Sequence, residues 1–232
     1  MIAHSTKNLL GMGLYTPSEA AYLARVSTQM MKRWIHGSKS GRAAVRAQLT
    51  DDSEKMITFL DFIQTLAIRA IRKDNTHRIT LQKIREFIRV AKDEYGIDYP
   101  FARRHTTYAF NDDIVLSLSG EESRIIQITG RYKNQDMIRP VVELYMEDLS
   151  YDPSGLARKY TPFSYHNREI IINPEIRFGE PILYPSGISA FALTDAARSE
   201  GSIEAAAEAY EVDRDDIIAS LKYEDYLDDR VS

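Results

Sequence analysis

The chain has 232 residues, no cysteine and a formal net charge of −4, and 44% of its residues are apolar. This length accommodates one large domain or two to three small ones, and the apolar content suffices for buried cores. The lack of cysteine excludes disulfides, thiolate metal sites and cysteine nucleophiles. Neither a membrane-length apolar run nor an apolar leader follows Met1, so we expect a cytoplasmic protein.

The charge is distributed unevenly along the chain. Residues 1–50 contain seven Lys/Arg and one acid, Glu19, whereas residues 151–232 contain eight Lys/Arg and sixteen Asp/Glu. Cationic segments attract phosphate and acidic ones repel it. A nucleic-acid partner is therefore expected at the N-terminal end.

Residues 15–37 have the pattern of two short helices joined by a turn. Thr16-Pro17-Ser18-Glu19 combines a capping-box Thr and Glu with a proline at the first helical position, which predicts a helix over residues 17–24. Ser27 is placed to cap a second helix, which Gly37 ends. Its apolar face consists of Met31, Trp34 and Ile35.

The opposite face of the second helix carries polar and basic side chains at helical spacing. The second helix of a helix-turn-helix enters the major groove, where Gln29 would suit adenine and Arg33 guanine. The polar segment 38–55 predicts a wing beside the phosphate backbone. The candidate DNA-binding residues are Thr28, Gln29, Lys32, Arg33, His36, Lys39, Arg42 and Arg46. The alternative is a merely solvated basic corner.

One residue departs from the usual helix-turn-helix pattern. The turn position before Val26 commonly holds glycine, which accepts a positive φ, but this chain has Arg25. An arginine there costs on the order of 1 kcal/mol or imposes a different turn.

The rest of the chain predicts an α+β, mostly helical fold. Two apolar-faced helices are expected at residues 58–73 and 81–95, as core elements or dimer contacts. A β-region and a possible helix follow at 107–110, 114–118, 124–129 and 135–148. After the linker signal at 152–155 come a strand at 169–172, a turn-rich stretch, and helices at 189–199, 202–210 and 213–227. The expected domains are 14–96, 97–152 and 153–232.

The last two helices loosely echo the spacing of the N-terminal pair. The final one begins Asp213-Arg214-Asp215-Asp216 and continues through further acids, a face that DNA phosphates would repel. We therefore expect residues 153–232 to bind protein, the alternative being a solvated acidic surface.

Signals for enzymatic chemistry are weak. The five histidines never fall within four residues of one another, so no helical metal pair exists. Gly11-Met12-Gly13 follows no predicted strand, and Gly187-Ile188-Ser189 lacks the second glycine of a nucleophile elbow. We expect no enzyme activity, no metal and no cofactor.

Several motifs resemble known families. Tyr15-Thr16-Pro17-Ser18-Glu19-Ala20-Ala21, Val26-Ser27, Lys32-Arg33-Trp34 and Thr80-Leu81-Gln82-Lys83-Ile84-Arg85 resemble a MerR-type winged helix-turn-helix. Ile170-Ile171-Ile172-Asn173-Pro174, Phe178-Gly179-Glu180-Pro181-Ile182 and Gly201-Ser202-Ile203-Glu204-Ala205 resemble a small three-helix domain found in antitoxins. Together they make the chain similar to VapB-type antitoxins.

The resemblance implies a function and two partners. VapB-type antitoxins neutralise a PIN-fold ribonuclease toxin and repress their own operon, so the expected partners are the toxin and double-stranded operator DNA, bound by a homodimer. One alternative is a stand-alone MerR-like transcription regulator whose middle region, residues 97–150, senses a small molecule. Another is an interaction scaffold without DNA binding.

Overall fold

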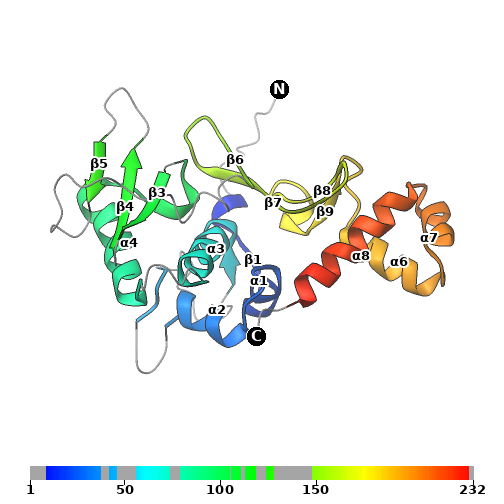
Figure 1. Ribbon diagram of the computed structural model, residues 1–232, viewed down its shortest axis with the longest axis horizontal. Coiled ribbons are helices and arrows are strands. Elements are labelled where there is room, and N and C mark those ends of the chain that lie inside the picture. Colours follow the sequence, from blue (N-terminus) through cyan, green and yellow to red (C-terminus); the bar gives the residue numbers. More distant parts are fainter. Residues whose placement is uncertain are drawn as a thin grey trace. The chain divides into compact units, whose positions relative to one another are not determined.

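The computed structural model describes residues 9–37, 42–45, 56–73, 79–104, 106–110, 113–118, 124–127 and 148–229 (Figure 1). For the strands between residues 106 and 127, only the backbone is described. The chain divides into two compact units, residues 10–157 and the residues from 158 onward. Helices and antiparallel strands occur in both, so the fold is α+β, as predicted.

The first unit contains the predicted N-terminal helices. Their bounds are α1 (Pro17–Leu23), α2 (Thr28–Ile35), α3 (Phe59–Lys73) and α4 (Leu81–Tyr95), with short 3-10 turns at Leu9–Gly11 and Pro100–Ala102. The predicted caps are present: the Glu19 N–H donates to Thr16 Oγ1 at 3.2 Å, and the Thr16 N–H donates to the Glu19 carboxylate at 2.7 Å. Gly96 ends α4 with a φ of 66°. Local capping chemistry therefore fixes these helix ends.

Helix α3 is the core of the first unit. Every residue from Phe59 to Ile68 is buried, Asp61 and Gln64 included. The expectation of one apolar face was therefore too narrow, because neighbouring elements cover the helix on all sides. Tyr15 lies 5.4 Å from Phe62 between ring centroids, and Phe87 of α4 stacks on Phe101 at 5.0 Å. A helix buried within its own unit is a poor candidate for a dimer contact.

Two small antiparallel sheets belong to the first unit. β1 (Gly13–Tyr15) pairs with β2 (Ile57–Thr58), a pairing the sequence did not predict. β3 (Thr106–Phe110), β4 (Asp113–Leu118) and β5 (Arg124–Gln127) form a meander, which confirms the predicted β-region. β6 (Leu149–Tyr151) follows. The helix expected at 135–148 lies almost wholly outside the described residues.

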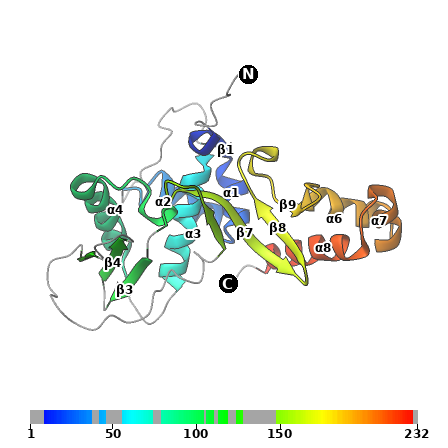
Figure 2. The same cartoon turned by 90° about the horizontal axis from the view of Figure 1, so that it is seen from above.

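The second unit joins an antiparallel sheet to three consecutive helices. β7 (Ala157–Tyr165) pairs with β8 (Arg168–Ile172), and β8 pairs with β9 (Ile182–Tyr184). A 3-10 turn (Arg177–Gly179) lies between β8 and β9. The predicted helices follow as α6 (Ala190–Ser199), α7 (Ile203–Tyr210) and α8 (Arg214–Asp228), and β8 runs beside α8 (Figure 2). The sequence analysis placed no strand at β7 or β9.

No helix in the described residues combines the length and the apolar character needed to cross a membrane.

Candidate nucleic-acid interface

The turn between α1 and α2 has the geometry that usually selects glycine. Arg25 takes a φ of 53°. Its N–H donates to the Tyr22 carbonyl at 3.0 Å, and the Val26 N–H donates to the Ala21 carbonyl at 2.9 Å. These two bonds form a Schellman motif. The chain thus keeps the tight turn and accepts the conformational cost of placing an arginine there.

Helix α2 is fixed by a cap at its start and by one buried face. The Met30 N–H donates to Ser27 Oγ at 3.2 Å, as the sequence predicted. Met31, Trp34 and Ile35 are each at most 2% exposed, which confirms the predicted apolar face. Burial of these three side chains sets the rotation of α2 about its own axis, and therefore decides which residues face outward.

The outer face of α2 presents most of the predicted polar strip. Gln29, Lys32 and Arg33 are exposed, and Thr28 is half-buried. His36, the C-cap residue of α2, is half-buried as well. The strip is therefore shorter than predicted and is centred on Gln29, Lys32 and Arg33.

Sequence reasoning missed Met30 as a member of this face. Its side chain is 42% exposed and lies one turn before Arg33. An exposed methionine on the outer face offers apolar contact to a thymine methyl group. Met30 lies three residues before Arg33, a spacing that places both on the same face of a helix. This signal was available in the sequence, but apolar residues are usually assigned to the core.

The segment after α2 is tied to the end of that helix. The N–H groups of Ala44 and Val45 both donate to the Trp34 carbonyl, at 2.6 and 2.9 Å. Arg85 of α4 donates its Nε–H to the Ala43 carbonyl at 3.0 Å. Arg42, which is exposed, is therefore held near the C-terminal end of α2. Lys39 and Arg46 lie outside the described residues.

The second unit contains another helix pair with the same local geometry. Ser202 caps α7 as Thr16 caps α1, accepting the Ala205 N–H at 3.1 Å. Glu211 has a φ of 53° at the turn, and the Val212 N–H donates to the Ala207 carbonyl at 3.0 Å. The two pairs correspond residue by residue: Glu211 stands where Arg25 stands, and the Asp213 N-cap where Ser27 stands. The spacing seen in the sequence therefore reflects a repeated helix–turn–helix geometry.

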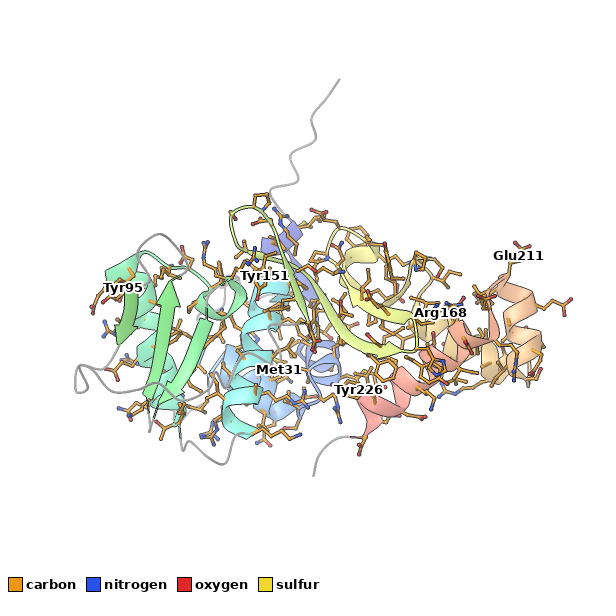
Figure 3. The ribbon with its side chains drawn as sticks, turned by 45° about the horizontal axis from the view of Figure 1, so that its top comes forward. Met31, Tyr95, Tyr151, Arg168, Glu211 and Tyr226 are labelled. Carbon is orange, nitrogen blue, oxygen red and sulfur yellow. The ribbon has the colours of Figure 1, made fainter. Side chains whose placement is uncertain are left out.

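In the second pair, the β7–β8 hairpin covers part of α8. The covered part corresponds to the face that is exposed on α2. Arg168 donates from Nη2 to Asp213 Oδ2 at 2.5 Å and from Nε to Asp216 (Figure 3). Asp216, the counterpart of Met30, is only 8% exposed. The hydrogen bond to Asp216 is the main reason that the pKa of Arg168 is raised.

Two more side chains of the same hairpin approach α8. The Lys222 ammonium lies 5.2 Å from the centre of the Tyr165 ring, and His166 Nδ1 lies 4.0 Å from Asp215. A helix with a hairpin against its start cannot enter a DNA groove along that face. Of the two second helices, α2 and α8, it is α2 that presents an open polar and basic surface.

No known family model and no curated protein matches the chain. Among solved structures it is similar to the crystal structure of Rv2018 from Mycobacterium tuberculosis, with a TM-score of 0.62. The match covers 90% of this chain and 98% of that chain, at 17% sequence identity. At this identity the similarity shows a shared fold alone, and it places this chain among proteins built like Rv2018.

Proposed function

We propose that this protein binds double-stranded DNA through a MerR-like helix-turn-helix formed by α1 and α2. The outer face of α2 carries the proposal: Gln29, Lys32 and Arg33 are exposed on one short helix whose other face is buried. A short helix held outward in this way fits the major groove, which is about 12 Å wide.

Each side chain of this face has a role that follows from its chemistry. Arg33 donates two hydrogen bonds to a guanine edge, and Gln29 pairs with the donor and acceptor of adenine. Lys32 and Arg42 are point contacts to phosphate, which position the helix without reading sequence. Lys39 and Arg46 would extend the phosphate contacts along the wing. Because one short helix reads few base pairs, a homodimer on an inverted repeat supplies the remaining affinity.

The second part of the proposal concerns the second unit, which we assign to an antitoxin role. Its residues 158–229 include seven Lys/Arg and fifteen Asp/Glu, so the unit repels nucleic acid and attracts cationic proteins. A PIN-type ribonuclease toxin, which must bind anionic RNA, has the complementary charge. The protein then neutralises the toxin with one unit and represses its own operon with the other.

Two experiments test the two parts separately. A mobility-shift titration with the duplex upstream of its own gene tests DNA binding, and a shuffled duplex of equal length is the control. We expect retention of the native duplex at concentrations at which the shuffled one stays free. In the second experiment a PIN-type ribonuclease gene is sought next to the gene of this chain, and the purified ribonuclease is assayed on RNA with increasing amounts of the protein. Undiminished cleavage at molar excess would refute the antitoxin role.

A further inference from the structure

The second unit carries exposed apolar side chains on one loop. Residues 173–187, which we call the aromatic loop, run from the end of β8 through the three-residue strand β9 to the turn before α6. Phe178 is 68% exposed, Tyr184 53% and Ile176 38%. Exposed aromatic groups of this size on one short segment are a mark of an interaction site in soluble proteins.

The backbone of the aromatic loop holds this arrangement in a costly conformation. Arg177, Phe178 and Gly179 have consecutive positive φ values of 46°, 55° and 80°. Left-handed backbone disfavours residues with a Cβ, and two of these three have one. Asparagine or glycine would fit the backbone at this position more easily, so Phe178 stands against the local conformational preference.

Hydrogen bonds fix the two turns of the loop to each other. The Gly179 N–H donates to the Ile176 carbonyl at 3.1 Å, and the Glu180 N–H donates to the Arg177 carbonyl at 3.1 Å. The Arg177 Nε–H donates to the Gly187 carbonyl at 3.1 Å, which joins the turn that bears Phe178 to the turn after Tyr184. A surface prepared in this way loses little conformational entropy when a partner binds.

The charges of the aromatic loop are balanced within the loop and its neighbouring strand. Arg158 pairs with Glu175 at 3.3 Å, and Arg177 Nη1 lies 3.9 Å from Glu180. The Lys159 ammonium lies 6.0 Å from the centre of the Tyr184 ring. These cations have partners of their own, and the surrounding unit has a large excess of acids. Phosphate is therefore repelled, whereas a protein with an apolar pocket in a cationic surface is attracted.

We propose that the aromatic loop is the site at which the second unit docks on a basic ribonuclease, with Phe178 and Tyr184 inserted into an apolar pocket of that partner. This inference rests on the proposed antitoxin function. Aromatic anchors surrounded by paired charges have the composition of interface hot spots. The net negative charge of the unit steers the cationic partner, and the aromatic loop supplies the short-range contact.

The test measures binding of the purified neighbouring ribonuclease to the full-length chain by titration calorimetry. The variants are Phe178→Asn and Tyr184→Ser. Tyr210→Ser is the matched control, because Tyr210 is a 41% exposed aromatic residue of the same unit outside the loop. We expect each loop variant to weaken binding about tenfold or more, while the control binds like the parent protein.

A second measurement separates loss of an interface from loss of folding. Asparagine tolerates a positive φ better than phenylalanine, so Phe178→Asn is expected to unfold at the same denaturant concentration as the parent or a higher one. A merely structural Phe178 would instead lower that midpoint. Weaker ribonuclease binding at unchanged or higher stability supports the inference.

The remaining outcomes overturn the inference in distinguishable ways. Parent and loop variants that bind the ribonuclease equally well would leave the antitoxin role standing and refute the aromatic loop as its site. A parent protein that does not bind the ribonuclease refutes the antitoxin role and the inference together. Loop variants that lose DNA binding or self-association instead, measured by mobility shift and sedimentation, would assign the loop to a nucleic acid or to a second copy of this chain.

Discussion

Arg25 and Glu211 occupy the same position in two helix–turn–helix pairs, and both have a φ of 53°. Each follows a short helix, and each is followed by a valine whose N–H donates five residues back, to Ala21 or Ala207. Neither is glycine, although this conformation disfavours side chains with a Cβ. The two turns share their geometry, although one lies in the basic N-terminal segment and the other in the acidic second unit, so only the exposed side chains distinguish the two pairs.

Replacing Glu211 by glycine is expected to stabilise the second unit. Its side chain is exposed at the tip of the turn (Figure 3), so little contact is lost, and left-handed backbone costs a non-glycine residue about 1 kcal/mol. Urea unfolding followed by circular dichroism should show a free energy of unfolding higher by about 0.5–1 kcal/mol. Glu211→Ala is the control, because it removes the carboxylate but keeps the Cβ. If Glu211→Ala raised the free energy of unfolding by as much, the effect would come from removing the charge and not from the backbone conformation.

The converse substitution, Gly96→Ala, is expected to destabilise the first unit. Gly96 ends α4 with a φ of 66°, and a Cβ added there would meet no atom within 4 Å. The loss is therefore conformational and should be about 1 kcal/mol, with a smaller loss for Gly96→Asn. Trp34, the single tryptophan, is 2% exposed in this unit and reports its unfolding by fluorescence. Equal losses for alanine and asparagine would contradict this explanation.

Arg168 is expected to be the most sensitive charged residue of the second unit. Its guanidinium bonds both Asp213 and Asp216, and the Arg168 and Asp216 side chains are only 18% and 12% exposed. Arg168→Met leaves the Asp216 carboxylate nearly buried without its cation, at a cost of about 2–3 kcal/mol. Arg168→Lys should lose less, since it keeps the charge but not the two-pronged geometry.

The control for Arg168 is Arg158→Met. Arg158 pairs with Glu175 at side-chain exposures of 32% and 42%, where an ion pair contributes about 1 kcal/mol or less. Thermal unfolding of both variants compares the two pairs directly. Similar losses for Arg158→Met and Arg168→Met would show that the hairpin is not fastened to α8 by Arg168.

Base readout by α2 is expected to depend on Gln29 and Arg33, which are exposed on its outer face. Arg33→Ala should lower the preference for the operator over a duplex with guanine substitutions by about 1–3 kcal/mol, and Gln29→Ala should do the same for adenine substitutions. Competition titrations measure this preference. A uniform loss of affinity for all duplexes would instead assign both residues to phosphate contacts.

Much of the fold could be predicted where short-range chemistry decides it. Capping residues such as Thr16, Ser27 and Ser202 begin helices where the sequence predicted. The pairing of β1 with β2 was missed because it joins residues more than forty positions apart. β9 was missed because it has only three residues, and the nine-residue β7 because it contains Pro162 and lacks alternating apolar residues. The burial of α3 on all sides is likewise a property of tertiary packing.

The exposed face of α2 could also be predicted, because helical periodicity decides which residues share a face of a helix. Helical periodicity separated Met31 and Trp34 from Gln29 and Arg33, and the structure places these residues on the predicted faces. Periodicity could not show that His36 ends the helix and is half-buried, or that Met30 is exposed. The covering of Asp216 by Arg168 was also beyond the sequence, because it depends on a contact between distant segments.

The salt dependence of operator binding tests the assignment of α2 most directly. Fluorescence anisotropy titrations of the duplex upstream of its own gene would be run at several salt concentrations. The parent protein would be compared with Lys32→Ala/Arg33→Ala and with Arg198→Ala/Lys222→Ala, which removes the same charge from the second unit. We predict that the α2 variant binds at least tenfold more weakly, with a log–log salt slope lower by about one or more, and that the control variant keeps the parent slope. An unchanged slope in the α2 variant would contradict DNA binding through this helix.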